Sequence, residues 1–317
     1  MIRPTSAMKK LRFVISLTTD DNDYQQEQAR CAKEAAQRLG VELDIIHAGN
    51  DAITQSQQLL KVIQSPSGPR PDGIVFEPVG GTAFPQVARA SAAAGIAWAV
   101  LNREAEYLSE LRKTYKIPVF ALTSDHLEIG RIQGRQFNAL LPTGGTVLYI
   151  QGPSGSLAAQ QRAAGMYETK LPEIQVRVLK AQWTEASSYQ SVSSWLRLRT
   201  SHETRINVVS GQDDSMAMGA RKAFQEIANQ SERERWLALP FTGCDGLPET
   251  GQAWVRSGLL AATVVVPANT GQALEMLVRS AQTGAMPPEQ TLTVPSSYPE
   301  LKQIAARKTE KSRSAFV

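Results

Sequence analysis

The chain has 317 residues, more than one ordinary compact domain contains, and this length suits two domains of average size. Hydrophobic residues make up 42% and charged residues 20%, so both domains can bury a core, and the net charge is only +4. Two cysteines, Cys31 and Cys244, exclude a disulfide framework, and no run approaches the ~18–20 apolar residues of a membrane span.

The first part of the chain alternates short apolar runs with stretches of helical periodicity. The first helix should end at Gly40, because glycine is favoured directly after a helix. The expected helices reach Leu39 and cover Ile53–Ile63 and Phe84–Ala94. The expected strands are Phe13–Leu17, Leu43–Ile46, Gly73–Phe76, Ala97–Leu101 and Val119–Thr123.

The same alternation then begins again. A helix is expected over Leu127–Leu140, with Asp125 as its N-cap, and another over Gly271–Ala281. The expected strands are Thr146–Ile150, Val176–Leu179, Asn207–Ser210, Leu239–Thr242, Ala261–Val266 and Thr291–Val294.

Two strand–helix series predict an α/β protein with two doubly wound parallel-sheet lobes joined by three crossover strands, because parallel pairing requires crossover connections. We expect the N-terminal lobe to comprise residues 9–123 and 267–290 and the C-terminal lobe residues 124–266 and 291–305, with tails at 1–8 and 306–317. The crossovers are expected near Thr123–Asp125, Val264–Pro267 and Gln290–Val294.

Polar side chains follow many of these strands, and open parallel sheets bind ligands at the carboxyl ends of their strands. Carboxylates, amides and an arginine suit a hydroxyl-rich ligand, and an aromatic residue suits its C–H surfaces. These strand-end segments are 20–24, 102–103, 151–156, 211–215 and 243–246.

Seven motifs occur in the order and spacing of one family, over about Leu11 to Pro295. They are Asn-x-aromatic at Asn22–Tyr24, Leu101-Asn-Arg, Ser124-Asp-His, Arg162-x-x-Gly, Asp213-Asp-x-Met-Ala-x-Gly-Ala, Gly243-Cys-Asp-Gly and Gly258-Leu-Leu-Ala-Ala-Thr. The chain thus resembles the ribose-binding type of periplasmic sugar-binding protein, whose two-lobed domain also forms the effector half of lactose-repressor-like regulators.

The resemblance implies roles for three residues. Tyr24 matches a ligand-stacking aromatic, Arg103 an arginine that grips sugar oxygens, and Asp245 an aspartate that accepts from sugar hydroxyls. This chain departs from the family where it carries Asn102 for an aspartate, Asp213 for an asparagine, Gln160 for an arginine and Val266 for a glutamine. The predicted ligand-binding residues are Tyr24, Asn102, Arg103, Gln160, Asp213 and Asp245.

Each of these residues also has an ordinary structural interpretation. Tyr24 could pack within the first turn of its helix, and Asp213 could be a helix N-cap. Asp245 could hold its turn, and Arg103 could be a surface residue. We take Asp214 and Arg162 as structural, and Trp183 stays open between ligand stacking and an edge aromatic.

These observations predict a non-catalytic protein whose lobes close on a small sugar, polyol or deoxysugar. The histidines lie on separate elements without a paired nucleophile, so we expect no catalysis and no cofactor or metal. The resemblance implies a monomer in the periplasm that serves an ABC transporter permease or a membrane sensor, without nucleic acid.

An alternative interpretation stays open for both the cellular compartment and the function of the protein. No export signal precedes the first strand, so a cytoplasmic location stays open. The alternative function is a ligand-sensing effector domain of the lactose-repressor type. The DNA-binding part of such a regulator needs about 50–60 residues before the first strand, and only about ten precede Leu11 here.

Overall fold

The computed structural model describes residues 10–65, 69–80, 83–103, 105–199, 201 and 205–306. His202 and nearly all of both expected tails lie outside these residues. The chain divides into two compact units: unit 1 comprises Met1–Ser124 and Ala268–Thr293, and unit 2 comprises Asp125–Pro267 and Val294–Val317. The chain therefore passes from one unit to the other three times.

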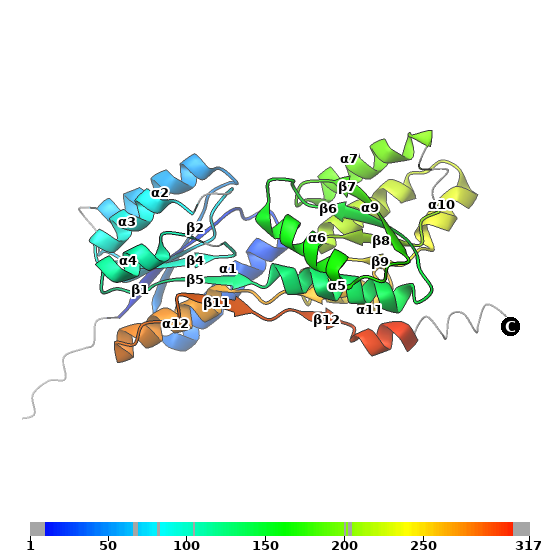
Figure 1. The fold of residues 1–317 in the computed structure, drawn as a ribbon. Coiled ribbons are helices and arrows are strands. Elements are labelled where there is room, and N and C mark those ends of the chain that lie inside the picture. The colour runs from blue at the N-terminus through cyan, green and yellow to red at the C-terminus, as the bar shows by residue number, and fades with distance from the viewer. Residues whose placement is uncertain are drawn as a thin grey trace, which may run out of the picture. The chain divides into compact units, whose positions relative to one another are not determined.

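Unit 1 is a six-stranded parallel sheet in the order β11-β5-β4-β3-β1-β2 (Figure 1). Residues 291–293 belong here rather than to the C-terminal lobe, because they pair with β5 through Thr293 opposite Ser124. Its elements are β1 (Arg12–Leu17), α1 (Asp23–Leu39), β2 (Glu42–His47), α2 (Ala52–Gln64), β3 (Gly73–Phe76), α3 (Pro85–Ala93), β4 (Ala97–Leu101), α4 (Leu108–Thr114), β5 (Val119–Ser124), α12 (Thr270–Thr283) and β11 (Gln290–Thr293).

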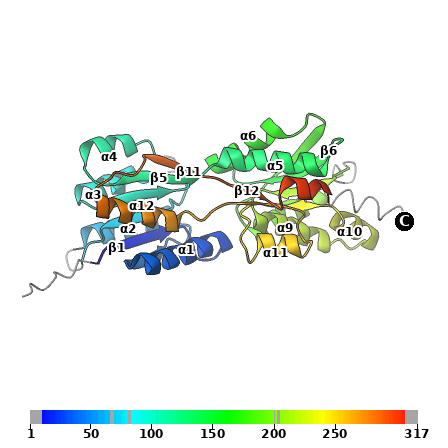
Figure 2. The same cartoon turned by 90° about the horizontal axis from the view of Figure 1, so that it is seen from below.

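Helices cover both faces of this sheet, as Figures 1 and 2 show. Helices α2, α3 and α4 pack on one face around Trp98 and Phe76, whose ring centroids are 4.5 Å apart. Helices α1 and α12 pack on the other face around Phe13 and Phe120. The central strands β3, β4 and β5 are fully buried and mostly apolar, as strands covered on both faces must be.

Unit 2 has a parallel sheet in the order β7-β6-β8-β9. Parallel bridges from Thr242 and Asp245 continue it to β10, and β12 then pairs with β10 in the antiparallel direction. Its elements are α5 (His126–Leu140), β6 (Gly145–Gln151), α6 (Leu157–Thr169), β7 (Ile174–Lys180), α7 (Glu185–Leu196), β8 (Val208–Gly211), α9 (Asp214–Gln225), α10 (Gln230–Leu237), β9 (Phe241–Thr242), α11 (Gly251–Arg256), β10 (Thr263–Val265), β12 (Ser296–Tyr298) and a final helical stretch at 301–306.

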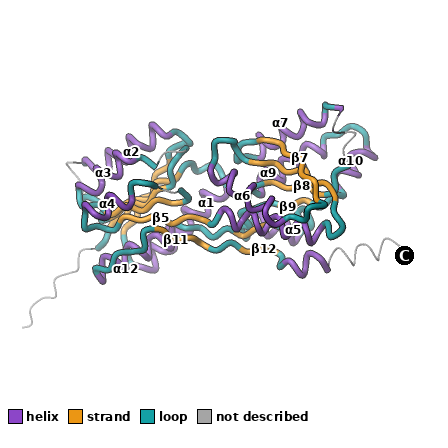
Figure 3. Tube along the Cα trace, viewed as in Figure 1, coloured by secondary structure: helices purple, strands orange, loops and turns teal. Residues whose placement is uncertain are grey.

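Helices flank this sheet as well, and Figure 3 shows strands enclosed by helices in each unit. Helices α7, α9, α10 and α11 enclose an aromatic core in which Phe224 stacks on Trp236. Helices α5 and α6 pack on the other face around Phe137 and Tyr149. The prediction of doubly wound parallel sheets is confirmed, with β12 as one antiparallel addition.

Local signals in the sequence position the helices that lead to the strand ends. Asn22 caps α1 and Gly40 ends it at φ +69°, in the left-handed region that favours glycine. Asp125 caps α5 by accepting from Glu128 N at 2.9 Å. Both the Gly40 and the Asp125 predictions are confirmed.

The close contact of α5 with α6 depends on glycine. A Cβ atom on Gly130 would lie 2.0 Å from the Arg162 carbonyl oxygen, and one on Gly165 would lie 2.0 Å from that of Leu127. Any larger residue would push the two helices apart. These glycines therefore fix the place of α6, the helix that carries Gln160 and Arg162.

Candidate functional site

The carboxyl end of the unit 1 sheet presents polar side chains from three neighbouring segments. Glu77 follows β3 directly, Asn102 follows β4, and Asn22 to Gln25 lie between β1 and the body of α1. Gln25 donates from Nε2 to Glu77 Oε2 at 2.8 Å. Glu77 was missed in the sequence analysis, although its position directly after a buried strand is the signal that would have identified it.

Tyr24 and Asn102, both predicted ligand residues, belong to one hydrogen-bonded ring. The Tyr24 hydroxyl accepts from Gln28 Nε2 at 3.3 Å and from Asn102 Nδ2 at 3.5 Å. Gln28 Oε1 accepts from the backbone N–H of Asn269 at 2.9 Å, and Asn269 Nδ2 donates to Asn102 Oδ1 at 2.7 Å. The ring ties α1, the end of β4 and the start of α12 together.

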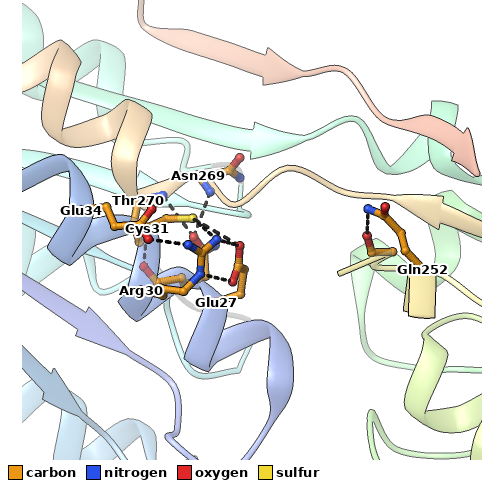
Figure 4. A network of polar contacts seen from close by, with 9 residues as sticks. Glu27, Arg30, Cys31, Glu34, Gln252, Asn269 and Thr270 are labelled. Atoms are coloured by element: carbon orange, nitrogen blue, oxygen red, sulfur yellow. Dashed lines mark hydrogen bonds and ion pairs between the residues drawn. The ribbon is translucent and has the colours of Figure 1, made fainter. Parts of the chain in front are cut away.

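Figure 4 shows Asn269 and Thr270 at the start of α12, beside the α1 residues Arg30 and Cys31. Thr270 N also donates to Gln28 Oε1 (3.1 Å), and Thr270 Oγ1 donates to the Gln28 carbonyl (2.6 Å). Gln28 therefore satisfies the first N–H groups of α12. Its side chain is fully buried.

Asn102 is occupied by protein contacts. Its Oδ1 accepts from Ser124 Oγ at 3.3 Å as well as from Asn269, which uses both lone pairs of an amide oxygen. Its backbone has φ +54°, a left-handed conformation that asparagine tolerates better than most residues. The position therefore shapes the loop after β4, and direct ligand contact by Asn102 stays a prediction.

Arg103 is partly buried and anchored to the backbone. It donates from Nε to the Gly80 carbonyl (3.4 Å) and from Nη1 to the Asn102 carbonyl (3.1 Å). Among the residues that the structure describes, these are its hydrogen-bond acceptors, so three of its five N–H groups face other partners or solvent. A guanidinium held in this way has donors to offer to ligand oxygens.

The carboxyl end of the unit 2 sheet carries two adjacent buried aspartates. Asp213 is the N-cap of α9 and accepts from Met216 N at 2.5 Å. Burial raises the pKa of Asp213 to about 6, although the Met216 N–H and the Arg162 charge favour the ionised form. The N-cap interpretation of Asp213 is confirmed, which leaves its second carboxylate oxygen as the candidate ligand contact.

Asp214 makes different contacts from those of Asp213. Its Oδ2 accepts from Gly246 N at 2.8 Å and its Oδ1 accepts from Thr263 Oγ1 at 2.7 Å. The carboxyl group thus joins the start of α9 to the loop after β9 and to β10. The prediction that Asp214 is structural is confirmed. Its role rests on tertiary contacts, those with Gly246 and Thr263.

Arg162 occupies the interior next to Asp213. It is 7% exposed, donates from Nη1 to the Gln212 carbonyl, and lies with Cζ 5.4 Å from the centroid of the Trp183 ring. Its charge interacts with those of Asp213 and Asp245. Its Nε has no hydrogen-bond partner among the described residues. Arg162 therefore packs against the Trp183 ring and supplies positive charge to two carboxylates.

Trp183 lies partly exposed against Gly152, the residue that follows β6. A Cβ atom at Gly152 would come within 2.5 Å of the indole ring, so only glycine leaves room for it. Gln212 Oε1 accepts from Gly152 N at 2.9 Å and fixes the same loop. The indole thus contacts both Gly152 and Arg162, and its stacking on a ligand stays a prediction.

Asp245 and Gln160 contrast in their settings. Asp245 is partly buried at φ +103°, which is strained for any residue except glycine, and its backbone bonds to Val264 and Val266. Such strain is concentrated at functional positions. Gln160 is exposed and donates to the Ser154 carbonyl at 2.8 Å, so its side chain is committed to its own loop. Val266 is buried.

The described residues hold no group of three or more His, Cys, Asp or Glu side chains that could bind a metal ion. Within the same residues, no helix is long and apolar enough to cross a membrane. Cys31 and Cys244 are free thiols. The chemistry of the strand ends is therefore that of hydrogen-bonding and charged side chains.

Three comparisons place this geometry among known proteins. The family model described as "Periplasmic binding protein domain" matches residues 13–285. The chain is 25% identical over 259 residues to the ribose import binding protein RbsB of Escherichia coli K12, covering 82% of this chain and 80% of that relative.

Two solved structures share the fold. One is an ABC transporter periplasmic solute binding protein from Actinobacillus succinogenes 130z with bound D-allose (TM-score 0.77, 19% identity, 93% of this chain and 99% of that one). The other is an ABC transporter solute binding protein from Bacillus halodurans C-125 with bound myo-inositol (TM-score 0.75, 18% identity, 95% and 98%). The predicted fold class is confirmed by both.

Proposed function

The chain belongs to the periplasmic binding protein domain family, and on that premise we propose that it binds a small sugar, polyol or deoxysugar and delivers it to an ABC transporter. The observation that carries the proposal is the chemistry at the carboxyl ends of both sheets. Each unit places carboxylates, amide groups, an arginine and an aromatic ring there.

The donors and acceptors suit a hydroxyl-rich solute. Arg103 offers guanidinium N–H groups, while Glu77, Asp213 and Asp245 offer carboxylate oxygens that accept from hydroxyls. Tyr24 and Trp183 offer ring faces for the C–H surface of a pyranose or cyclitol. Binding by both units would stabilise a closed arrangement, because one ligand then contacts two bodies.

Transport is favoured over gene regulation and over catalysis. The relative from Escherichia coli is an import binding protein, and the two solved structures are named as transporter components. We therefore propose a periplasmic location and a transporter permease as the partner, and binding without turnover.

A thermal-shift screen of sugars and polyols, followed by calorimetry, tests the function. A true ligand raises the melting temperature, because it binds the folded state alone, and it should bind with a stoichiometry of one. Ribose, allose, myo-inositol and deoxysugars form the first panel, and amino acids and nucleosides form the control panel. A shift confined to the control panel would refute a carbohydrate-type solute.

A further inference from the structure

Glu77 is held rigidly at the carboxyl end of β3. Its backbone N–H donates to the Ser16 carbonyl at 2.9 Å, and its own carbonyl accepts from Gln55 Nε2 at 2.8 Å. Gln55 is fully buried and also contacts Ser16 Oγ and Val79 N. The direction in which the Glu77 side chain leaves the sheet is thereby fixed.

The carboxylate of Glu77 is short of positive charge. Its hydrogen-bond donors are neutral amides, that of Gln25 at 2.8 Å and that of Asn102. Among the described residues, no Lys or Arg nitrogen forms an ion pair with it within 4 Å; Arg103 acts on it electrostatically while donating to two backbone carbonyls. Carboxylates that leave water without a paired cation are costly to a fold.

Burial raises the pKa of Glu77, while the Gln25 amide, the charge of Arg103 and the Asn102 amide oppose the shift. A cation brought by the ligand would relieve the shortage, whereas a neutral hydroxyl would only donate one hydrogen bond.

We propose that Glu77 receives the protonated amine of an amino-bearing sugar or polyol, and that this carboxylate sets the preference of the site for a cationic solute. The inference rests on the proposed function and narrows its ligand class. Asp213 and Asp245 at the strand ends of unit 2 are acids as well, and the buried Arg162 offsets part of their charge.

The test compares matched ligands by calorimetry on the full chain. The pairs are D-glucosamine with D-glucose, D-galactosamine with D-galactose, and an amino-inositol with myo-inositol; the N-acetyl sugars serve as uncharged nitrogen controls. Glu77→Gln keeps the shape of the side chain and removes its charge. Glu42→Gln, an exposed acid at the amino end of β2, is the control variant.

We expect at least one amine to bind about tenfold or more tightly than its neutral and N-acetyl partners, and Glu77→Gln to bring that ratio close to one while Glu42→Gln leaves it unchanged. In the wild-type chain the amine preference should fall as the pH is lowered through the raised pKa of Glu77, a measurement that needs no variant.

The outcomes separate this inference from the proposed function. Neutral sugars or polyols that bind as tightly as their amines, or a ratio that Glu77→Gln leaves intact, would overturn the role of Glu77 while the solute-binding function stands. Binding of no sugar or polyol, charged or neutral, would overturn both.

Discussion

Replacing Asp214 with asparagine should remove a pH dependence from the stability of unit 2. The carboxyl group is 3% exposed, and burial raises its pKa to about 8, with the nearby Asp213 charge adding to the rise and the bonds from Thr263 and Gly246 opposing it. A free aspartate titrates near pH 4. The folded state therefore binds one more proton than the unfolded state between about pH 4 and 8.

The sign of the effect follows from this difference. A pKa raised on folding contributes stability that is present below the unfolded pKa and is lost as the pH rises through the folded one. The free energy of unfolding should fall by at most about 1.4 kcal/mol per pH unit from this group. Asparagine resembles the protonated acid: its oxygen can accept from Gly246 N while its NH₂ donates to Thr263 Oγ1.

Urea unfolding followed by tryptophan fluorescence provides the assay, because Trp183, Trp195, Trp236 and Trp254 all lie in unit 2. The difference in unfolding free energy between wild type and Asp214→Asn should decline steadily from pH 5 to pH 8. The exposed acid Glu249 supplies the control variant, Glu249→Gln. A difference that stays flat or grows with pH would show that Asp214 is ionised in the folded state.

Three further outcomes are expected. Arg103→Ala should weaken ligand binding by about 2–4 kcal/mol, or roughly 30- to 1000-fold in Kd, because charge-assisted bonds are lost. Arg89→Ala on the outer face of α3 is the control and should leave the affinity unchanged. An unchanged calorimetric affinity of Arg103→Ala would show that Arg103 is not part of the site. Small-angle scattering should show compaction at saturating ligand, and an unchanged radius of gyration would argue against closure. In competition calorimetry, neutral polyols, deoxysugars or amino sugars should outcompete ribose, since Val266 replaces a polar amide. Sugar acids and sugar phosphates should bind poorly because Asp213 repels them. Tightest binding by a sugar acid would contradict this prediction.

The fold was largely predictable because its signals are local. Strands buried on both faces appear as continuous apolar runs, and Gly40 and Asp125 mark helix ends by their own backbone and side-chain chemistry. The predicted strand at 239–242 shrinks to Phe241–Thr242, because Pro240 has no N–H to donate to a sheet. Helix α4 and strand β12 are short and carry too few residues for a period to show.

The site was less predictable because its contacts are remote in sequence. Gln28 caps α12 across 241 residues, and Asp214 joins Thr263 across 49. No periodicity in the sequence predicts such pairs. Glu77 is a different case, since its place after β3 is visible in the sequence and only its contacts with Gln25 and Asn102 are not.

Several features at the strand ends cost stability, and they coincide in space with the predicted ligand residues of each unit. Asn102 and Asp245 have positive φ, Arg162 has a buried nitrogen without a partner among the described residues, and Glu77 is partly buried with no ion pair to a Lys or Arg among those residues. None of these features is needed to hold the two parallel sheets together, because the apolar core of each unit is formed by other residues. A fold keeps such costs where another molecule offsets them, as a solute rich in donors would. The same costs explain selectivity, because a ligand that leaves the carboxylates unpaired gains little from entering.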